Sequence, residues 1–221
     1  MSGMVLYGID ISPPVRACLL TLKALGLQYE YKHVDILSGE QLAEDFTKNN
    51  PQHTVPTLND NGTWLWDSHA ICAYLVDKYA KDDSLYPRDL ALRARVHQRL
   101  FFDASILYMP LRFITIPMFR FNRSIVPREK TQGVIEGYVL MEKFLANSPY
   151  LVGDRLTIAD LCCVATASSL AGVVELEQEK YPKLHAWMER LKKLPYYEEG
   201  NGVGCKKYLE ILKKRLTAIV S

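Results

Sequence analysis

Three short stretches of the chain place polar side chains where one secondary-structure element gives way to the next. The first is "YGIDISPPVRACLL" (Tyr7 to Leu20), in which Ser12 stands directly before Pro13 and Pro14. A strand-to-helix junction gathers backbone N–H groups and the positive end of a helix dipole, so a hydroxyl there can donate to an anion. Serine is also a favoured helix N-cap, and on local grounds the two interpretations weigh equally. No G-x-S-x-G surrounds Ser12, so we expect a donor and not a nucleophile.

The second stretch is "NPQHTVPTL", where Pro56 stands at the start of a strand-like run. A proline cannot donate to a sheet ladder, so its presence needs a conformational reason. A cis Val55–Pro56 bond would leave the Val55 N–H and C=O free to pair with an extended peptide. The alternative is a trans proline on an edge strand, which this motif alone favours because only about 5–6% of X-Pro bonds are cis.

The third stretch is "WDSHAI", in which Asp67 and Ser68 stand where a helix is expected to begin. An acid and a hydroxyl at a helix start are most often a simple cap. The same groups could bind a ligand, because the Ser68 hydroxyl and the helix N-terminus suit a carboxylate while Asp67 suits an ammonium group. An amino-acid-like head group would use both.

The elements that must position these residues alternate between strand and helix over the first 80 residues. Strand-like runs cover 4–10, 27–36, 54–60 and 63–67, and the last two are joined by Asn61-Gly62, a strong hairpin signal. Helical spacing follows Pro13, a short helix is expected over 38–50, and a further helix over 67–80. The predicted order is β-α-β-α-β-β-α.

Strand signals vanish after a linker, and the rest of the chain has helical patterns. A long helical stretch begins at Asp89, and Pro110 and Pro117 are expected to kink or end it. Thr157 and Asp160 resemble a capping box, whose role is in folding. Further helical stretches cover 128–147, 157–172, 182–194 and 205–219. The sequence therefore predicts an α/β module followed by an all-α module.

Composition narrows the classes of function. The net charge of +2 predicts no nucleic-acid partner, and the sequence contains no apolar run near the roughly 20 residues of a membrane span. The N-terminus carries no signal-peptide pattern. Five cysteines without C-x-x-C spacing fit a reducing cytosol better than a disulfide framework. The histidines and cysteines form no zinc-binding pattern, so no metal is expected.

Four motifs taken together resemble those of cytosolic glutathione transferases. They are S-P-P-V-R, N-P-Q-H-T-V-P-T-L, W-D-S-H-A-I and L-T-I-A-D, in this order and spacing. The resemblance covers essentially the whole chain and is to the insect delta/epsilon branch, epsilon more than delta. It implies a thioredoxin-like N-terminal domain over 1–82 with a mixed sheet, a linker over 83–90, and an all-α domain over 91–221. It also implies a cytoplasmic homodimer that uses glutathione as co-substrate and has no tightly bound cofactor.

The resemblance assigns expected roles to individual residues. Ser12 would hydrogen-bond the glutathione sulfur, while His53 and Val55, with Thr54 and cis-Pro56 beside them, would hold the cysteinyl-glycine part. The γ-glutamyl end would lie against Asp67, Ser68 and His69, and Gln41 would also contact the tripeptide.

The chain departs from many relatives at two of these positions. Relatives often carry Arg where His69 stands, and many carry His where Gln41 stands. If His69 is neutral at pH 7, both departures remove positive charge, and we expect weaker glutathione binding.

A second substrate needs an apolar pocket, and the stretch after the linker offers one stripe for it. Its members are Tyr108, Met109, Arg112, Phe113, Ile116 and Phe119. Any single member is more often core, but Arg112 is poorly explained as core, so we expect it to face the pocket and stabilise negative charge on an electrophile or leaving group.

Three functions compete. The leading one is conjugation of glutathione to hydrophobic electrophiles in xenobiotic detoxification, and the resemblance also admits dehydrochlorinase or peroxidase side activity. The alternative from another class is a non-catalytic ligandin or other binding protein on the same fold, against which the intact Ser12, His53 and Ser68 argue. A thiol transferase would need a catalytic cysteine where Ser12 stands.

Overall fold

The first 80 residues of the chain fold around a four-stranded mixed sheet. The computed structural model describes residues 3–121 and 123–220. The strand order is β2-β1-β3-β4, with β1 at Met4–Gly8, β2 at Glu30–His33, β3 at Thr57–Asp60 and β4 at Thr63–Trp66. β1 runs parallel to β2 and antiparallel to β3. The β3–β4 hairpin turns at Asn61 and Gly62, whose φ angles of 52° and 93° are the left-handed values that an Asn-Gly turn requires, so the predicted hairpin is confirmed.

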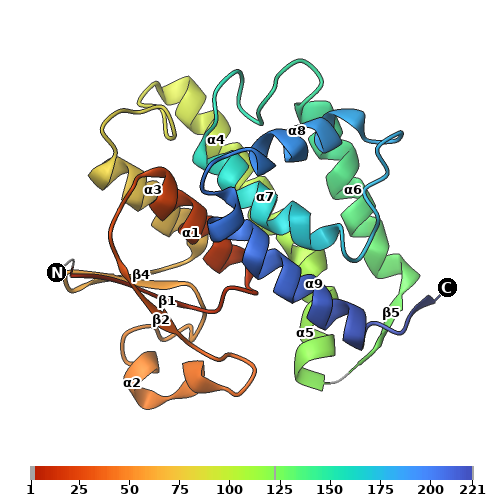
Figure 1. The fold of residues 1–221 in the computed structure, drawn as a ribbon, viewed down its shortest axis with the longest axis horizontal. Helices are drawn as coiled ribbons and strands as arrows, with labels where there is room; N and C mark the ends of the chain where they lie inside the picture. Colours follow the sequence, from red (N-terminus) through yellow and green to blue (C-terminus); the bar gives the residue numbers. More distant parts are fainter. Residues whose placement is uncertain (1–2, 122, 221) are drawn as a thin grey trace.

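Helices cover both faces of this sheet. α1 (Pro13–Ala24) and α3 (Ser68–Tyr79) lie together on one face, and α2 (Glu44–Thr47) lies on the other (Figure 1). The helix expected over 38–50 is shorter than predicted: a 3₁₀ turn over Glu40–Leu42 precedes α2. Gly39 has a φ of 90° and Ala43 is extended, so neither residue can continue a helix. The predicted element order is otherwise confirmed.

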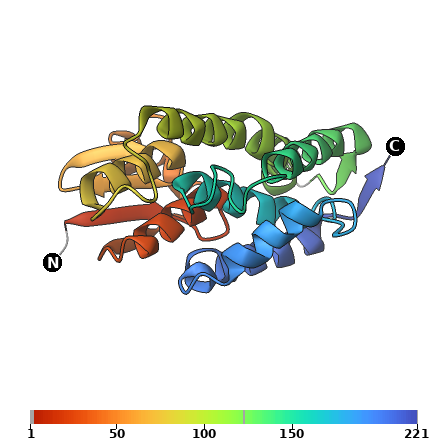
Figure 2. The same cartoon turned by 90° about the horizontal axis from the view of Figure 1, so that it is seen from above.

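Six α-helices in the described part of the chain make up most of the remainder. α4 and α5 form one outer layer, α8 and α9 the opposite one, and α7 runs between them (Figure 2). Their bounds are Leu90–Phe102 for α4, Tyr108–Phe121 for α5, Arg128–Phe144 for α6, Ile158–Leu170 for α7, Pro182–Lys192 for α8 and Val203–Arg215 for α9, with single π-helical turns over Asp103–Leu107 and Glu198–Gly202.

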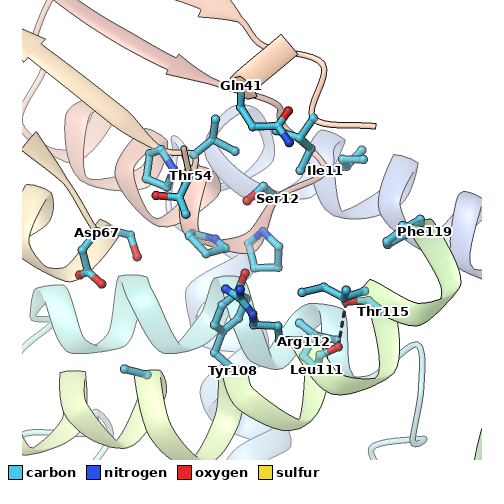
Figure 3. Close-up of a pocket in the computed structure, with 18 of the residues that line it drawn as sticks. Ile11, Ser12, Gln41, Thr54, Asp67, Tyr108, Leu111, Arg112, Thr115 and Phe119 are labelled. Atoms are coloured by element: carbon cyan, nitrogen blue, oxygen red, sulfur yellow. Dashed lines mark hydrogen bonds between the residues drawn. The ribbon is translucent and has the colours of Figure 1, made fainter. Parts of the chain in front are cut away.

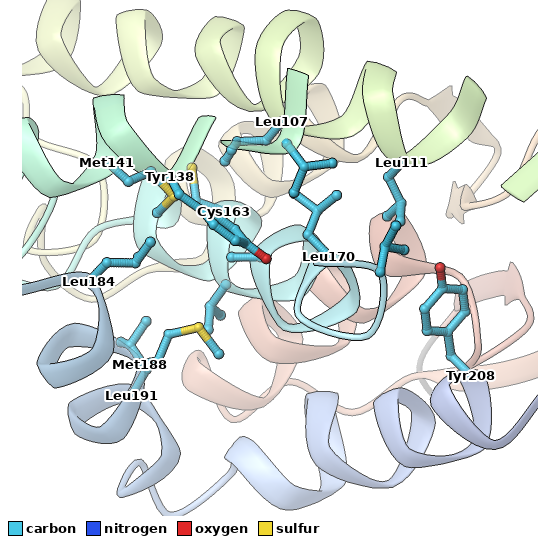
Figure 4. Close-up of a cluster of buried hydrophobic side chains, with 14 of the residues drawn as sticks. Leu107, Leu111, Tyr138, Met141, Cys163, Leu170, Leu184, Met188, Leu191 and Tyr208 are labelled. Atoms are coloured by element: carbon cyan, nitrogen blue, oxygen red, sulfur yellow. The ribbon is translucent and has the colours of Figure 1, made fainter. Parts of the chain in front are cut away.

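α7 joins the two parts of the molecule because it is buried along its whole length. Its Ala159 and Cys162 belong to the core under α1 and α3, whereas Leu161 and Leu170 belong to the core of the helical part (Figure 4). The predicted capping device is present at its start, where the Asp160 carboxylate accepts the Thr157 N–H at 2.9 Å.

Pro110 and Pro117 were expected to kink or end the long helix. Neither residue ends it, since the helix continues through both to Phe121. A π-helical turn over Asp103–Leu107 precedes them. It contains Ile106, whose carbonyl would accept an N–H from position 110 in a regular helix, and Pro110 has no N–H to donate.

The helical part also contains a small parallel ribbon. β5 (Ile125–Pro127) pairs with β6 (Ala218–Val220), so the segment expected to be helical to 219 ends its helix at Arg215. The C-terminal domain is therefore helical but not purely so.

The continuous helical segment Leu90–Phe119 is long and apolar enough, by length and composition alone, to span a membrane. This differs from the expectation that no such segment exists. Its inward residues are packed within the protein: Val96 and Leu100 lie in the core of the first module, and Leu107 and Leu111 in the core of the helical part. These are the contacts of a core helix.

Candidate active site

One cavity of about 560 Å³ lies between the loops of the sheet module and the α5 wall (Figure 3). All but one of the residues singled out in the sequence line it, and Phe113 is the exception. The lining set contains Ser12, Gln41, His53, Thr54, Val55, Pro56, Asp67, Ser68, His69, Tyr108, Met109, Arg112, Ile116 and Phe119.

Ser12 occupies the N-cap position of α1, yet its hydroxyl does not cap the helix. A capping side chain bonds to the N–H of the second or third helical residue, and the second here is Pro14, which has none. The backbone supplies the first helical bond instead, since the Arg16 N–H donates to the Ser12 carbonyl at 3.1 Å. The hydroxyl thus faces the cavity without a protein partner among the described residues, so the capping interpretation is wrong.

Arg16 anchors the first turn of α1 to the helical part of the protein. Its side chain is fully buried, and its guanidinium donates to Asn201 Oδ1 at 2.5 Å and to the hydroxyls of Ser168 and Ser169. These partners come from α7 and the turn before α9, so the first turn of α1 is tied to the helical part. The position of Ser12 is therefore set by contacts from both modules.

The loop before β3 presents backbone groups to the same cavity. Val55–Pro56 is a cis peptide bond, as the resemblance implied, and in the described chain no protein group hydrogen-bonds to the Val55 N–H or C=O. The fully buried Asn50 braces this loop, donating to the Thr54 carbonyl at 3.0 Å and to the Thr57 hydroxyl at 2.8 Å. The loop can pair with an extended peptide without losing bonds of its own.

The start of α3 combines an acceptor and a helix N-terminus. Asp67 caps the helix by accepting the His69 and Ala70 N–H groups, both on Oδ1, which leaves Oδ2 free. Its φ of 72° is unusual for a residue with a side chain. Ser68 is buried, lines the cavity and stands in the first turn of the 12-residue helix. A ligand carboxylate is favoured at such a terminus.

His69 lies between two carboxylates. Its Nε2 is 2.8 Å from Asp103 Oδ2, and its Nδ1 is 3.4 Å from Asp67 Oδ1. Burial alone would lower the pKa of His69, but the hydrogen bonds to Asp103 and Asp67 outweigh it and raise the pKa to about 10. His69 is therefore an imidazolium at pH 7, and the expectation of a lost positive charge is wrong for this residue.

Two buried acceptors in the lining have no partner in the described chain. Asp103 Oδ1 and Gln41 Oε1 both lack a hydrogen bond. The two residues are only 4% and 2% exposed to solvent, respectively. Together with the free Oδ2 of Asp67, Asp103 Oδ1 forms an acceptor pair around one imidazolium, a set with net charge −1. Such a site suits a ligand ammonium group.

The opposite wall of the cavity comes from α5 (Figure 3). Tyr108, Ile116 and Phe119 face the cavity on one side of this helix, and the exposed side chain of Arg112 lies among them. Phe113 follows Arg112 by about 100° around the helix and is 57% exposed outside the lining, so its predicted place in the pocket is wrong.

Several site residues were missed in the sequence. No local motif surrounds Asp103, Asn50 or Tyr208. Asp103 and Tyr208 look in the sequence like ordinary residues of amphipathic helices. The one signal for Asp103 in the sequence is that it is a polar residue within an otherwise apolar run. Ile11, Leu111 and Thr115 also line the cavity.

Within residues 3–121 and 123–220, no cluster of three or more His, Cys, Asp or Glu side chains is arranged to hold a metal ion. The five cysteines are buried and free. The chemistry that the cavity offers is thus a hydroxyl donor at a helix start, backbone groups for an extended peptide, a charged site for an amino-acid head group and an adjoining apolar wall.

Comparison with known proteins agrees with the chemical groups found in the cavity. The chain matches the glutathione S-transferase N-terminal domain over residues 6–83 and the C-terminal domain over 107–195. It is 45% identical to glutathione S-transferase 1 of Manduca sexta over 203 residues, covering 91% of this chain and 93% of that one.

Solved structures give the same result. An epsilon-class glutathione S-transferase from the housefly, Musca domestica, superposes with a TM-score of 0.95 at 53% identity, covering 97% of this chain and 99% of that one. A glutathione transferase homologue from Drosophila mojavensis with bound glutathione has a TM-score of 0.96 at 44% identity, covering 99% and 100%. The chain belongs to the glutathione S-transferase family, and its structural neighbours include the insect epsilon class.

Proposed function

We propose that this protein activates glutathione at Ser12 and joins its thiolate to hydrophobic electrophiles held against α5. The observation that carries the proposal is the single cavity in which the unengaged Ser12 hydroxyl, the unpaired Val55 backbone and the start of α3 meet an apolar wall. A non-catalytic binding protein would have no need for a free hydroxyl at the start of α1.

The tripeptide would extend along the lining in one direction. Its γ-glutamyl ammonium would bind the free oxygens of Asp67 and Asp103, and its carboxylate the Ser68 end of α3. The cysteinyl residue would pair with the Val55 backbone, with Thr54 and Pro56 beside it. His53 and Gln41 would contact the glycine end. This order puts the sulfur at Ser12.

Thiol activation is within reach of these groups. A free thiol has a pKa of about 8.5, and lowering it by about two units takes roughly 2.7 kcal/mol. A hydrogen bond to a charged group contributes about 1.5–3 kcal/mol, and a helix N-terminus about 0.3–1 kcal/mol. Ser12 and the start of α1 can therefore supply the shift without a general base. Pro13 and Pro14 restrict the backbone behind Ser12, so its donor is aimed before the ligand arrives.

We also propose that the protein works as a homodimer in the cytoplasm. Leu90 is 82% exposed and Phe101 is 71% exposed, and their spacing of eleven residues puts both on one face of α4. A second copy of the chain would cover this apolar stripe. Five free, buried cysteines suit a reducing compartment.

The proposal is tested by measuring conjugation of glutathione to 1-chloro-2,4-dinitrobenzene. Wild type should exceed the uncatalysed rate strongly, and Ser12→Ala should lose most of that activity. Ser84→Ala is a matched control, because Ser84 is an exposed serine outside the cavity. Wild-type activity at the background level would refute the enzyme, and full activity in Ser12→Ala would refute the role of Ser12.

A further inference from the structure

A second cavity, of about 430 Å³, lies away from the glutathione site and against one face of α8. It is an open groove between this helix and the turn over 145–149, which follows α6, and it shares no lining residue with the first cavity. α8 belongs to an outer layer of the helical part (Figure 2). We call this cavity the α8 groove, and its helix side is formed by Lys183, Ala186 and Arg190.

The charged side chains that line the α8 groove are both positive. Lys183, Ala186 and Arg190 follow one another at spacings of three and four residues, so they share one side of the helix. Within the described chain, no acidic side chain lines the groove. Lys192 on the same helix pairs with Glu189 at 2.7 Å, whereas Lys183 and Arg190 form no ion pair with any described residue. The groove therefore presents two positive charges without a counter-charge.

Glu142, at the end of α6, contacts the start of α8 but leaves the Lys183 ammonium group unpaired. Its Oε1 accepts the Lys183 backbone N–H at 3.0 Å, and its Oε2 accepts the Leu184 N–H at 2.8 Å. This carboxylate therefore caps the helix and occupies the positive end of its dipole. The capacity of the groove to bind an anion consequently comes from its side chains.

Arg190 is held in place on one side and free on the other. Its Nη1 donates to the Pro149 carbonyl at 2.7 Å, and its guanidinium lies 5.6 Å from the centre of the Tyr150 ring. A guanidinium carries five N–H groups in a rigid fork, and among the described residues this one donates only to Pro149. The other N–H groups can bind the oxygens of an anion in parallel, with little loss of side-chain entropy.

We propose that the α8 groove binds small molecules that carry two phosphate groups. Lys183 and Arg190 are seven residues apart, which is about 10.5 Å along the helix axis, so their long side chains can reach two neighbouring phosphates above Ala186. The Asn147 amide and the Ser148 hydroxyl line the opposite wall and donate to no described residue. A phosphate has more charge and more acceptor oxygens than a carboxylate, so it suits a site built from donors. The inference is independent of the glutathione chemistry.

The test is isothermal titration calorimetry of the whole protein with pyrophosphate at low ionic strength. S-methylglutathione is present throughout, so that the first cavity is filled. Wild type should bind one pyrophosphate per chain with a Kd of about 1 mM or tighter. Lys183→Ala combined with Arg190→Gln should raise this Kd by at least about tenfold, because two partly exposed charged contacts are lost. Sulfate, a single dianion, should bind wild type at least about threefold more weakly than pyrophosphate.

Lys192→Ala combined with Lys193→Ala is the matched control. It removes two positive charges from the end of the same helix, and neither residue lines the groove. The control should bind pyrophosphate as wild type does. If Arg190→Gln lowers the melting temperature, Lys183→Ala alone, a change at an exposed residue, should still raise the Kd by about threefold.

The outcomes are separable. A loss of pyrophosphate binding confined to the Lys183 and Arg190 variants supports the inference. Equal losses in both double variants would show attraction to net charge alone and would overturn it. No binding by wild type, or sulfate bound as tightly as pyrophosphate, would also overturn it. If wild type fails to conjugate glutathione, the proposed function fails and this inference stands, since the groove variants report on pyrophosphate alone.

Discussion

The Nε2 atom of His69 lies 2.8 Å from Asp103 Oδ2, so the first turn of α3 is joined to the π-helical turn between α4 and α5. Both residues line the cavity, and Asp103 is almost completely buried. The contact thus links the two modules at the point where the ligand head group is proposed to bind. It also keeps His69 charged, since the pair raises the pKa of His69 to about 10.

Replacing Asp103 should weaken glutathione binding more than turnover. Asp103→Asn removes the charged acceptor of the proposed ammonium contact, and bonds to charged groups contribute about 1.5–3 kcal/mol, so KM for glutathione should rise about tenfold or more. Asp77→Asn is the control, because Asp77 pairs with Arg93 outside the cavity. The KM for glutathione is measured by steady-state kinetics at varied glutathione concentration. Equal KM values in both variants would show that Asp103 is not part of the head-group site.

The His69 ion pairs should make stability fall as the solution becomes alkaline. The folded pKa of His69, about 10, lies above its unfolded value of about 6.5. The stabilising contribution is therefore complete below about pH 6.5 and is lost as the pH rises to 10. The contribution is measured as the difference in unfolding free energy between wild type and His69→Gln, from urea unfolding between about pH 6.5 and pH 10. The advantage of wild type should shrink with pH, whereas parallel curves would show that His69 is not charged in the folded protein.

Arg112 should influence some electrophiles and not others. Its exposed guanidinium lines the cavity, so Arg112→Ala should slow reactions that develop negative charge near the cavity mouth by a few-fold and leave others unchanged. Phe113→Ala is the neighbouring control, because Phe113 lies outside the lining. Rates over a panel of aryl halides, benzyl halides and unsaturated ketones test this. Identical rates for every electrophile would place Arg112 outside the working pocket.

A charge on the exposed stripe of α4 should separate the protomers. Phe101→Glu places a carboxylate in the apolar surface shared with Leu90, which a second copy is proposed to cover. Sedimentation velocity should give a dimer for wild type and a monomer for the variant at micromolar concentration. Phe121→Glu, also on an exposed phenylalanine but at the end of α5, should remain dimeric. A wild-type monomer would refute the homodimer.

The sheet module and much of the site could be predicted because their signals are local. The Asn61-Gly62 turn requires left-handed backbone, and Pro14 is suited to the first turn of a helix that begins after Ser12. The four motifs supplied the remaining proposed ligand contacts by resemblance. These are properties of neighbouring residues, which a sequence displays directly.

What could not be predicted depends on contacts between distant residues. Asp103 acquires its role only because the π-helical turn brings it to His69, 34 positions earlier in the chain. The β5–β6 ribbon pairs three residues with three others more than 90 positions away, which is too short for any periodicity to show. Phe113 failed for a related reason, since a stripe of apolar residues does not fix which edge of a helix faces a cavity.

The central claim is that Ser12 lowers the pKa of the bound thiol, and an ultraviolet titration of the thiolate in the glutathione-saturated protein measures it directly. The claim predicts a wild-type midpoint about two pH units below the value of about 8.5 for a free thiol, and a midpoint at least about one unit higher in Ser12→Ala than in wild type. The same midpoint in both proteins, with glutathione bound in each, would contradict it.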